Sequence, residues 1–241
     1  AVNELLISGL KDNLTFKEWD ILSEETSKEK SFQRDNLKND WCWIIDPLDG
    51  TKDFLQGSEN YAVHIALAYK QKPKIGIVLI PERNELWFGI LGIGAWFENR
   101  EGTKKHFSFS ERLDISKLVL VSSKNHQQSI LIKLLSTLCF AETKKIGSVG
   151  CKIASILRGE ADVYISLSGK TSPKDWDMAA PSALIEAAGG VFSHADGTNL
   201  TYQKTNYSQS GCLIASHGKS HQKICQAAME FFSLEEPNYI V

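Results

Sequence analysis

Two carboxylates follow an apolar run in the segment WCWIIDPLDGTKDF, residues 41–54. Pro47 lies between Asp46 and Asp49, where it disfavours helical geometry at Asp46 and stiffens the turn. Two unit charges a few ångströms apart repel each other by roughly 1 kcal/mol in water and by several times more near protein. A hard divalent cation such as Mg²⁺, which takes oxygen ligands, offsets this repulsion. The segment therefore predicts part of a magnesium site, although a lone DxxDG motif is more often a β-turn beside a helix cap.

Two further acidic sites strengthen the metal hypothesis. LSEE, residues 22–25, places Glu24 at the end of an expected strand, and KDWDMAAP, residues 174–181, places Asp177 at the N-terminus of an expected helix. Asp177 alone would be an ordinary helix cap. Three acidic sites at the ends of strands or helices in one chain predict a cradle for a cation. Asp175 is expected to point elsewhere and is left out of this set.

The residues after DPLD offer a place for a phosphate group. Gly50 and Thr51 lead into KDFLQG, where free backbone N–H groups can hold a phosphate, and the carbonyl group of Leu48 can turn inward. Carboxylates suit Mg²⁺, whereas histidine and cysteine favour zinc, so no histidine is needed as a ligand. Read alone, His126 is a surface histidine and Lys152 a solvated lysine on a helix face.

The periodicity of apolar residues changes along the chain. Strands are expected at residues 19–25, 42–46, 61–70, 74–81, 85–91, 94–100, 118–123, 161–167 and 212–216, and helices at 1–10, 128–138, 150–159, 178–190 and 221–232. The run of strands separated by short turns predicts an antiparallel meander, and the later alternation of strands and helices predicts an α/β half. We therefore expect an α+β half at residues 1–112 and an α/β half at 113–241, joined in one two-lobed unit.

Composition and charge bound the class of protein. With 42% hydrophobic and 23% charged residues, the chain is an ordinary globular protein, and its net charge of −2 gives no electrostatic case for nucleic acid. No apolar run approaches the roughly 20 residues of a membrane span. Five scattered cysteines without a CxxC pair fit reduced, mostly buried thiols in a cytoplasmic protein. Because the chain begins at Ala1 inside an expected helix, we expect an N-terminal segment to be missing.

The motifs LSEE, DPLDGT and WDMAAP, the last followed by EAAGG, stand in an order that resembles one superfamily. It is the lithium-sensitive, magnesium-dependent phosphatases, which include inositol monophosphatase, fructose-1,6-bisphosphatase and 3'(2'),5'-bisphosphate nucleotidase. The resemblance implies a layered sugar-phosphatase fold of the α+β and α/β type, with mixed sheets sandwiched between helices (αβαβα). It also implies sensitivity to lithium.

Four segments are similar to the bisphosphate nucleotidase branch: DGTKDF, SSKNH, GSVGCKIASILRG and KDWDMAAP. The resemblance implies that two or three Mg²⁺ ions are held by the carboxylates of Glu24, Asp46, Asp49 and Asp177 and the carbonyl group of Leu48. It implies catalytic roles for Asp49 and Thr51, with Thr51 orienting the attacking water. It implies substrate contacts from Gly50, Thr51, Ser123, His126, Ser148 and Lys152. Ser148 departs from the glycine or alanine typical of its position.

The resemblance favours hydrolysis of the 3'-phosphate of adenosine 3',5'-bisphosphate (PAP) to give AMP, with its sulfated relative PAPS as a further candidate substrate in sulfur metabolism. A lysine such as Lys152 suits the phosphate that is not cleaved, which a monophosphate substrate lacks. The alternatives are an inositol monophosphatase, a fructose-1,6-bisphosphatase, or a catalytically weak fragment that binds metal or nucleotide. The last stays open because the family usually carries an acid before the first helix, in a V-T-x-A-D pattern. The expected partner is a phosphorylated nucleotide, with no nucleic acid or membrane, and a homodimer is left open.

Overall fold

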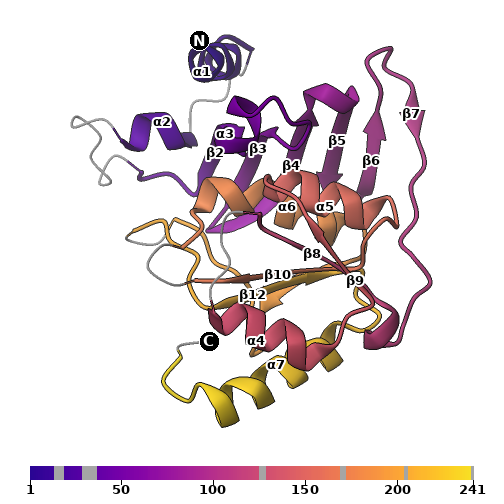
Figure 1. Ribbon diagram of the computed structural model, residues 1–241. Helices are drawn as coiled ribbons and strands as arrows, with labels where there is room; N and C mark the ends of the chain where they lie inside the picture. The colour runs from indigo at the N-terminus through magenta and orange to yellow at the C-terminus, as the bar shows by residue number, and fades with distance from the viewer. Residues whose placement is uncertain (14–18, 29–36, 125–128, 169–171, 204–205, 240–241) are drawn as a thin grey trace.

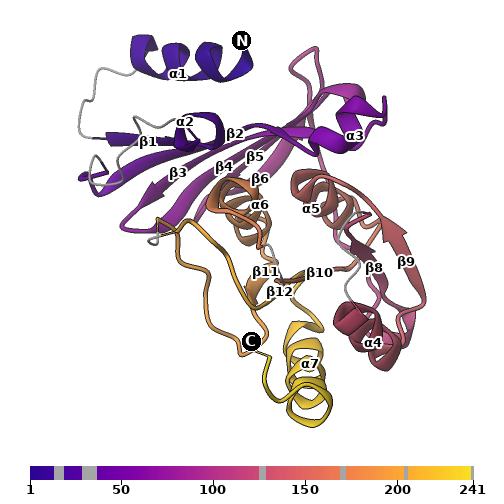
Figure 2. The same cartoon turned by 60° about the vertical axis from the view of Figure 1, so that its left-hand side comes forward.

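Two β-sheets lie in separate layers with helices between them and on their outer sides in the computed structural model (Figure 1). The structure describes residues 1–13, 19–28, 37–124, 129–168, 172–203 and 206–239. From the top of Figure 1 downward, the layers are helix α1 (Val2–Asn13), the seven-stranded sheet, helices α5 (Val149–Leu157) and α6 (Asp175–Ala187), the five-stranded sheet, and helices α4 (Ser129–Leu138) and α7 (His221–Glu235). Figure 2 shows the two sheets on either side of α5 and α6. The expected αβαβα sandwich is confirmed.

The seven-stranded sheet has its strands in chain order. They are β1 (Trp19–Ser23), β2 (Trp41–Asp49), β3 (Ala62–Tyr69), β4 (Lys72–Ile80), β5 (Glu85–Ile90), β6 (Gly94–Glu98) and β7 (Lys104–Lys105). β1 pairs in parallel with β2, and each later neighbouring pair is antiparallel. Buried and half-buried residues alternate along β3, which is the pattern of a strand with one face on the core. The predicted meander is confirmed, and β2 extends beyond the predicted strand at 42–46.

The five-stranded sheet has the order β11-β12-β10-β8-β9. Its strands are β8 (Val119–Ser122), β9 (Glu142–Lys145), β10 (Val163–Leu167), β11 (Val191–His194) and β12 (Cys212–Ser216). β8 pairs in parallel with β9 and β10, and β12 pairs antiparallel with β10 and β11. β9 and β11 were not predicted; β9 is the polar segment ETKK at an edge of the sheet. None of the helices among the described residues is long and apolar enough to cross a lipid bilayer.

Two apolar cores lie on opposite faces of the five-stranded sheet. On β12, Leu213 and Ala215 belong to the core shared with the larger sheet, α5 and α6, whereas Cys212 and Ile214 belong to the core shared with α4 and α7. Because successive side chains of a strand point to opposite faces, the whole strand is buried. All five cysteines are free thiols, and Cys139 alone among them is exposed, as the sequence led us to expect.

Helix α6 packs directly on the backbone of the larger sheet. A Cβ atom added to Gly76 on β4 would lie 2.3 Å from the carbonyl oxygen of Ala180, and one added to Gly89 on β5 would lie 2.6 Å from Cα of Leu184. These glycines therefore permit an approach that any side chain would prevent. The helix begins at Asp175, three residues before its predicted start, and so includes Asp177 in its first turn. Two short helices, α2 (Glu24–Ser27) and α3 (Thr51–Leu55), directly follow β1 and the end of β2.

Candidate active site

Three of the four predicted carboxylate ligands converge at the carboxyl end of β2. Asp46, Asp49 and Asp177 each offer one oxygen atom, and these atoms all lie within 4.8 Å of one another. Residues three apart on a regular strand point to opposite faces, but the pairing of β2 with β3 shifts register between Asp46 and Asp49. This irregularity lets both acids of DPLD serve one site, and Asp177 reaches it from the first turn of α6.

Burial and mutual repulsion make the cluster hold protons. Burial, followed by the charges of Asp49, Asp177 and Glu24, raises the pKa of Asp46 well above its ordinary value. Burial and the charge of Asp49 raise the pKa of Asp177 to about 7. A cation would remove this repulsion, and an all-oxygen donor set suits a hard ion such as Mg²⁺. The residues present therefore fit a magnesium site.

Backbone amides and one serine hold Asp49 in place. Its Oδ2 accepts hydrogen bonds from the Ser148 hydroxyl at 2.7 Å, from the amide of Val149 at 2.5 Å and from the amide of Gly150 at 3.4 Å. These donors form the N-terminus of α5, where the helix dipole favours a negative charge. Asp177 is fixed in a similar way, since its Oδ2 accepts from the amide of Lys174 at 2.6 Å.

Glu24, the fourth predicted ligand, is not among the acids that converge. Its carboxylate pairs at 2.9 Å with Lys28, the residue that follows α2. Its charge still raises the pKa of Asp46 and of Asp177, so it acts on the cluster electrostatically. Its role as a ligand stays a prediction.

Helix α3 begins beside the cluster. Gly50 is its N-cap residue with a left-handed φ of 89°, and an added Cβ atom there would lie 2.8 Å from the carbonyl oxygen of Asn60. Only glycine adopts this conformation and fits this space without strain. Thr51 is the first residue of the helix, is exposed, and donates its hydroxyl hydrogen bond to the carbonyl of Leu48 at 3.2 Å. The carbonyl group of Leu48 thus lies beside Thr51, and its role as a metal ligand stays a prediction.

A cavity of about 390 Å³ opens next to the acids. Asp49 and Asp177 line one part of it, together with Gly50 and Thr51. The remaining lining residues are Lys52, Asp53, Ser123, Leu131, Gly147, Val149, Lys152, Tyr164, Ile165, Ser166, Leu167, Ser172 and Pro173. Its volume falls in the range of small-molecule sites, roughly 300–1,000 Å³. The cavity combines an acidic end with two lysines and an apolar wall supplied largely by β10.

Lys152 is buried, which differs from the solvated lysine that the helix pattern alone indicates. Only 1% of the residue is exposed, and its Nζ donates to the carbonyl of Gly147 at 2.6 Å. The ammonium group also lies 5.1 Å from the ring centroid of Tyr164, a distance typical of a cation–π contact. Burial lowers the pKa of Lys152, and the carboxylate of Asp49 is the largest opposing influence.

Sequence reasoning missed Asp53, a buried acid that also lines the cavity. Burial alone would raise the pKa of Asp53, but hydrogen bonds from Lys124 at 2.8 Å and from Ser58 at 2.7 Å outweigh it and lower the pKa. An added Cβ atom on Gly147 would lie 1.8 Å from Oδ2 of Asp53, so this glycine makes room for the acid. The signal in the sequence was an acid two residues after Thr51, which also reads as a helix surface residue.

The other predicted substrate contacts differ in their surroundings. Ser123 follows β8 and lines the cavity. Ser148 is fully buried, and its hydroxyl donates to Asp49 and accepts from the amide of Cys151 at 3.2 Å, so it caps α5. His126 lies outside the described residues.

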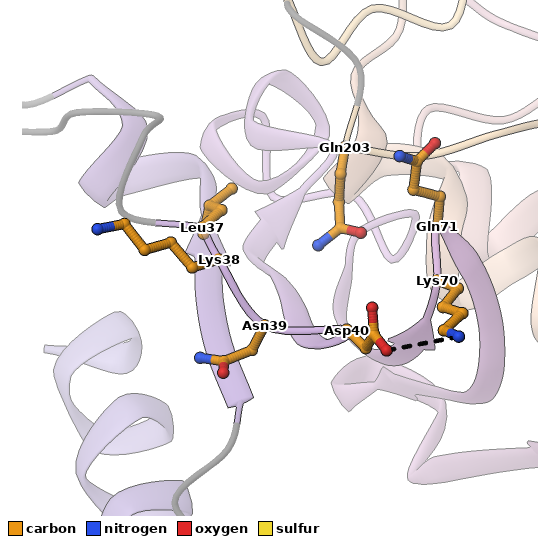
Figure 3. Close-up of a pocket in the computed structure, with 7 residues that line it drawn as sticks. All are labelled: Leu37, Lys38, Asn39, Asp40, Lys70, Gln71 and Gln203. Atoms are coloured by element: carbon orange, nitrogen blue, oxygen red, sulfur yellow. Dashed lines mark ion pairs between the residues drawn. The ribbon is translucent and has the colours of Figure 1, made fainter.

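A second cavity, of about 350 Å³, offers different chemistry (Figure 3). Its seven lining residues include one acid, Asp40, which pairs with Lys70 at 3.6 Å. Asn39, beside it, donates to Asp20 from both its backbone amide and its side chain. A single neutralised acid does not form a cradle for a divalent cation, so the first cavity is the candidate active site.

Comparisons with known proteins address the family and the fold of the chain. A model of the inositol monophosphatase family matches residues 1–231. The Nus factor SuhB of Vibrio cholerae is 28% identical over 94% of this chain and 79% of its own length. The 3'(2'),5'-bisphosphate nucleotidase CysQ of Buchnera aphidicola is 32% identical over 84% of this chain and 71% of its own length. The solved IMPase of Thermotoga maritima is 22% identical, covers 96% of this chain and 81% of its own, and aligns with a TM-score of 0.75, which shows a shared fold.

The family match spans nearly the whole described chain, and the DPLD and WDM motifs that suggested it supply the three converging acids. The relatives carry different names, so the match identifies the family but not the substrate. On this evidence the chain belongs to the inositol monophosphatase family.

Proposed function

We propose that this protein is a magnesium-dependent phosphomonoesterase that hydrolyses the 3'-phosphate of PAP to give AMP and inorganic phosphate, and that PAPS is a second substrate. The family supports a phosphomonoesterase, and the finer choice of substrate rests on the cavity. The main support for a bisphosphate substrate is Lys152, a buried lysine that lines the same cavity as Asp49 and Asp177.

The acidic end of the cavity suits the cleaved phosphate. Asp46, Asp49 and Asp177 would hold magnesium, with the carbonyl group of Leu48 and the nearby Glu24 as further ligands. When bound, Mg²⁺ supplies a Lewis acid that polarises the phosphoryl oxygens and offsets the charge that develops on the leaving group. The amides at the end of β2 and the start of α3 would hold the phosphate beside these acids.

Thr51 is suited to orient the attacking water. Its hydroxyl proton is committed to the carbonyl of Leu48, so its oxygen lone pairs are left to accept a hydrogen bond from water. The side chain is exposed, lines the same cavity as Asp49 and follows it by two residues in the chain. Fixing the direction of the water relative to the phosphorus atom lowers the entropic cost of orienting the two reactants, and so lowers the activation barrier.

The opposite part of the cavity suits a nucleotide. Lys152 would neutralise the 5'-phosphate that is retained, and Lys52, exposed on the cavity lining, adds a second positive charge. Tyr164, Ile165 and Leu167 of β10 line this part of the cavity, and the ring of Tyr164 would offer an apolar wall to a planar base. An inositol ring carries a hydroxyl on most of its carbons, and against that wall these hydroxyls would lack hydrogen-bond partners.

A substrate panel tests the proposal. Phosphate release would be measured from PAP, PAPS, inositol 1-phosphate and fructose 1,6-bisphosphate, each with Mg²⁺ and with EDTA. The expected result is the highest kcat/KM for PAP, with no release in EDTA. A higher kcat/KM for inositol 1-phosphate or fructose 1,6-bisphosphate would assign the protein to one of those activities instead. Calorimetric binding of Mg²⁺ and PAP without phosphate release from any substrate would indicate a binding protein.

A further inference from the structure

Asp53 contributes a carboxylate to the active-site cavity that is not part of the three-acid cluster. It is the third residue of α3, and only 1% of it is exposed. Its Oδ1 accepts hydrogen bonds from the Ser58 hydroxyl at 2.7 Å and from Nζ of Lys124 at 2.8 Å. Its Oδ2 accepts none from the residues that the structure describes. Because buried polar atoms normally have a partner, Oδ2 is available to a ligand in the cavity.

The turn before α5 leaves room for this oxygen. A Cβ atom added to Gly147 would lie 1.8 Å from Oδ2 and 2.5 Å from Cγ of Asp53, so any larger residue would displace the carboxylate. The carbonyl group of Gly147 also accepts the hydrogen bond of Lys152, the proposed partner of the retained phosphate. Asp53 and Lys152 therefore approach the same glycine, and all three residues line the cavity.

The charge of Asp53 limits what Oδ2 can bind. Burial would raise the pKa of Asp53, but the hydrogen bonds at Oδ1 outweigh it and lower the pKa, so the group is ionised at neutral pH and only accepts hydrogen bonds. A phosphate group would be repelled by the carboxylate, and a further cation would be repelled by Lys124. The suitable partner is a neutral donor, such as a hydroxyl or an amino group of the substrate.

The position of Asp53 on α3 favours a hydroxyl close to the cleaved phosphate. Gly50 and Thr51 begin this helix, where the backbone amides would hold that phosphate, and Asp53 lies in the same first turn. In PAP the 3'-phosphate and the 2'-hydroxyl are on adjacent carbons of the ribose. The amino group of adenine is at the other end of the nucleotide, which the proposed function places against Tyr164.

We propose that Asp53 is a specificity-determining residue of this cavity: its Oδ2 accepts a hydrogen bond from the substrate hydroxyl on the carbon next to the phosphate ester, which in PAP is the ribose 2'-hydroxyl. This inference rests on the proposed function for the position of the cleaved phosphate. A substrate without the hydroxyl leaves a buried, charged oxygen without a partner, and a site of this kind discriminates strongly against it.

The test compares kcat/KM for PAP and for 2'-deoxyadenosine 3',5'-bisphosphate, which lacks only that hydroxyl, at one saturating concentration of Mg²⁺. We expect the wild type to prefer PAP by about 10-fold or more. In Asp53→Asn, Lys124 and Ser58 keep the amide oxygen at the position of Oδ1, so the NH₂ group takes the position of Oδ2 and offers no acceptor. We expect this variant to lose most of the preference, with a ratio of roughly 1–3.

Asp162→Asn is the matched control. Asp162 is also a buried acid that accepts from a serine and from a cationic side chain, Ser110 and Arg112, but it contacts the start of β8 rather than the cavity. Both substrates are measured on one preparation, so a loss of folded protein cancels from the ratio. We therefore expect Asp162→Asn to keep the wild-type preference. A purely structural role of Asp53 would lower both values of kcat/KM by the same factor and leave the ratio unchanged.

The wild type alone can overturn the proposal, without any variant that must fold: equal kcat/KM for the two substrates would do so. A preference that survives in Asp53→Asn, or that is lost in Asp162→Asn, also overturns it. Inosine 3',5'-bisphosphate, which lacks the amino group of adenine, distinguishes the two donors. If Asp53→Asn loses discrimination against the inosine compound and not against the 2'-deoxy compound, the oxygen binds the base and the proposal fails.

The substrates also separate failure of this inference from failure of the proposed function. If PAP is hydrolysed and its 2'-deoxy analogue is an equal substrate, the role of Asp53 alone fails. If inositol 1-phosphate is hydrolysed and PAP is not, the proposed substrate fails. Analogues of inositol 1-phosphate that lack one hydroxyl beside the ester then decide the role of Asp53 by the same ratio. If the wild type hydrolyses none of these phosphate esters, both proposals fail.

Discussion

The ammonium group of Lys124 lies 2.8 Å from Oδ1 of Asp53, so an ion pair joins the segment after β8 to helix α3 and links the two sheets of the molecule. Asp53 is buried and depends on this partner and on Ser58. We expect Lys124→Met to lower the free energy of unfolding by about 1–3 kcal/mol, because the buried carboxylate loses a charged donor. Urea unfolding at pH 7 measures this loss.

Lys133→Met is the matched control for this prediction. Lys133 pairs with Glu236 at 3.1 Å, but its side chain is 57% exposed, and such pairs contribute about 0–1 kcal/mol. If both variants lose the same small amount, the link between the sheets is not a source of stability.

Asp49→Asn should abolish hydrolysis while the fold persists. The amide keeps the shape of the side chain and one oxygen for the donors of α5, but it removes the charge that a metal ion needs. We expect a loss in kcat larger than the roughly 10- to 100-fold that follows removal of a supporting group. Phosphate release and circular dichroism would be compared with those of Asp40→Asn, which changes an acid in the other cavity and should retain activity (Figure 3). Near-normal hydrolysis by Asp49→Asn would refute the site.

Stabilisation by Mg²⁺ should grow with pH. Burial and the charge of Asp49 raise the pKa of Asp177 to about 7, against an ordinary value of 3.8. Between these values the folded, metal-free protein binds more protons than the unfolded chain, so this group contributes stability that is lost as pH rises. Mg²⁺ must displace these protons, and it replaces them as the partner of the acids.

The measurement is the shift in Tm caused by saturating Mg²⁺ at pH 5 and at pH 8. We expect the larger shift at pH 8 and a release of protons on binding at pH 6. Equal shifts at the two pH values would mean that the ion does not bind at these carboxylates.

Acid should destabilise the protein through His221. The Ser193 hydroxyl donates to the carbonyl of His194, so it accepts from Nε2 of His221, and Nδ1 of His221 faces the Ser216 hydroxyl. Both ring nitrogens thus have hydrogen-bond partners when the ring is neutral, and burial lowers the pKa of His221 to about 4 from 6.5. The unfolded chain binds the extra proton first, so stability is complete above pH 6.5 and falls toward pH 4, by about 3 kcal/mol in total.

His221→Gln removes the titrating group and should flatten this part of the stability curve. Urea midpoints between pH 4 and pH 7 would be compared for the two proteins. An identical fall in both would place the acid sensitivity elsewhere.

Lys152→Met should weaken binding of a bisphosphate more than that of a monophosphate. PAP and adenosine 3'-monophosphate share the cleaved group and differ in the 5'-phosphate, so they form a matched pair of substrates. We expect KM for PAP to rise about 10-fold or more, equivalent to a charged contact of 1.4 kcal/mol or above, with a smaller change for the monophosphate. Equal changes for both substrates would mean that Lys152 supports the acids rather than the retained phosphate.

The sequence predicted those parts of the fold in which apolar residues recur with a clear period. The meander and the helices α4 and α7 were predicted because their buried residues recur every second residue or every three to four residues, whereas α5 is buried along its whole length. β9 was missed because ETKK has no apolar residue, and its pairing with β8 depends on a tertiary contact. In β9, Lys145 donates to the Ser122 hydroxyl, a contact that its local sequence does not suggest.

The candidate site was predicted where motif residues lie at the ends of elements, and it was incomplete where contacts cross the chain. The convergence of Asp46, Asp49 and Asp177 was expected from their positions. Asp53 was not proposed, because its local sequence also fits a residue on a helix surface, and its partner Lys124 is brought to it only by folding.

The close approach of α6 to Gly76 and Gly89 implies that the pocket is sensitive to changes far from its lining. A single methyl group at either glycine would lift the helix from the sheet and carry Asp177 away from its two fellow acids. Loss-of-function alleles recovered in a genetic screen should therefore cluster on these two strand positions as well as on the acids themselves.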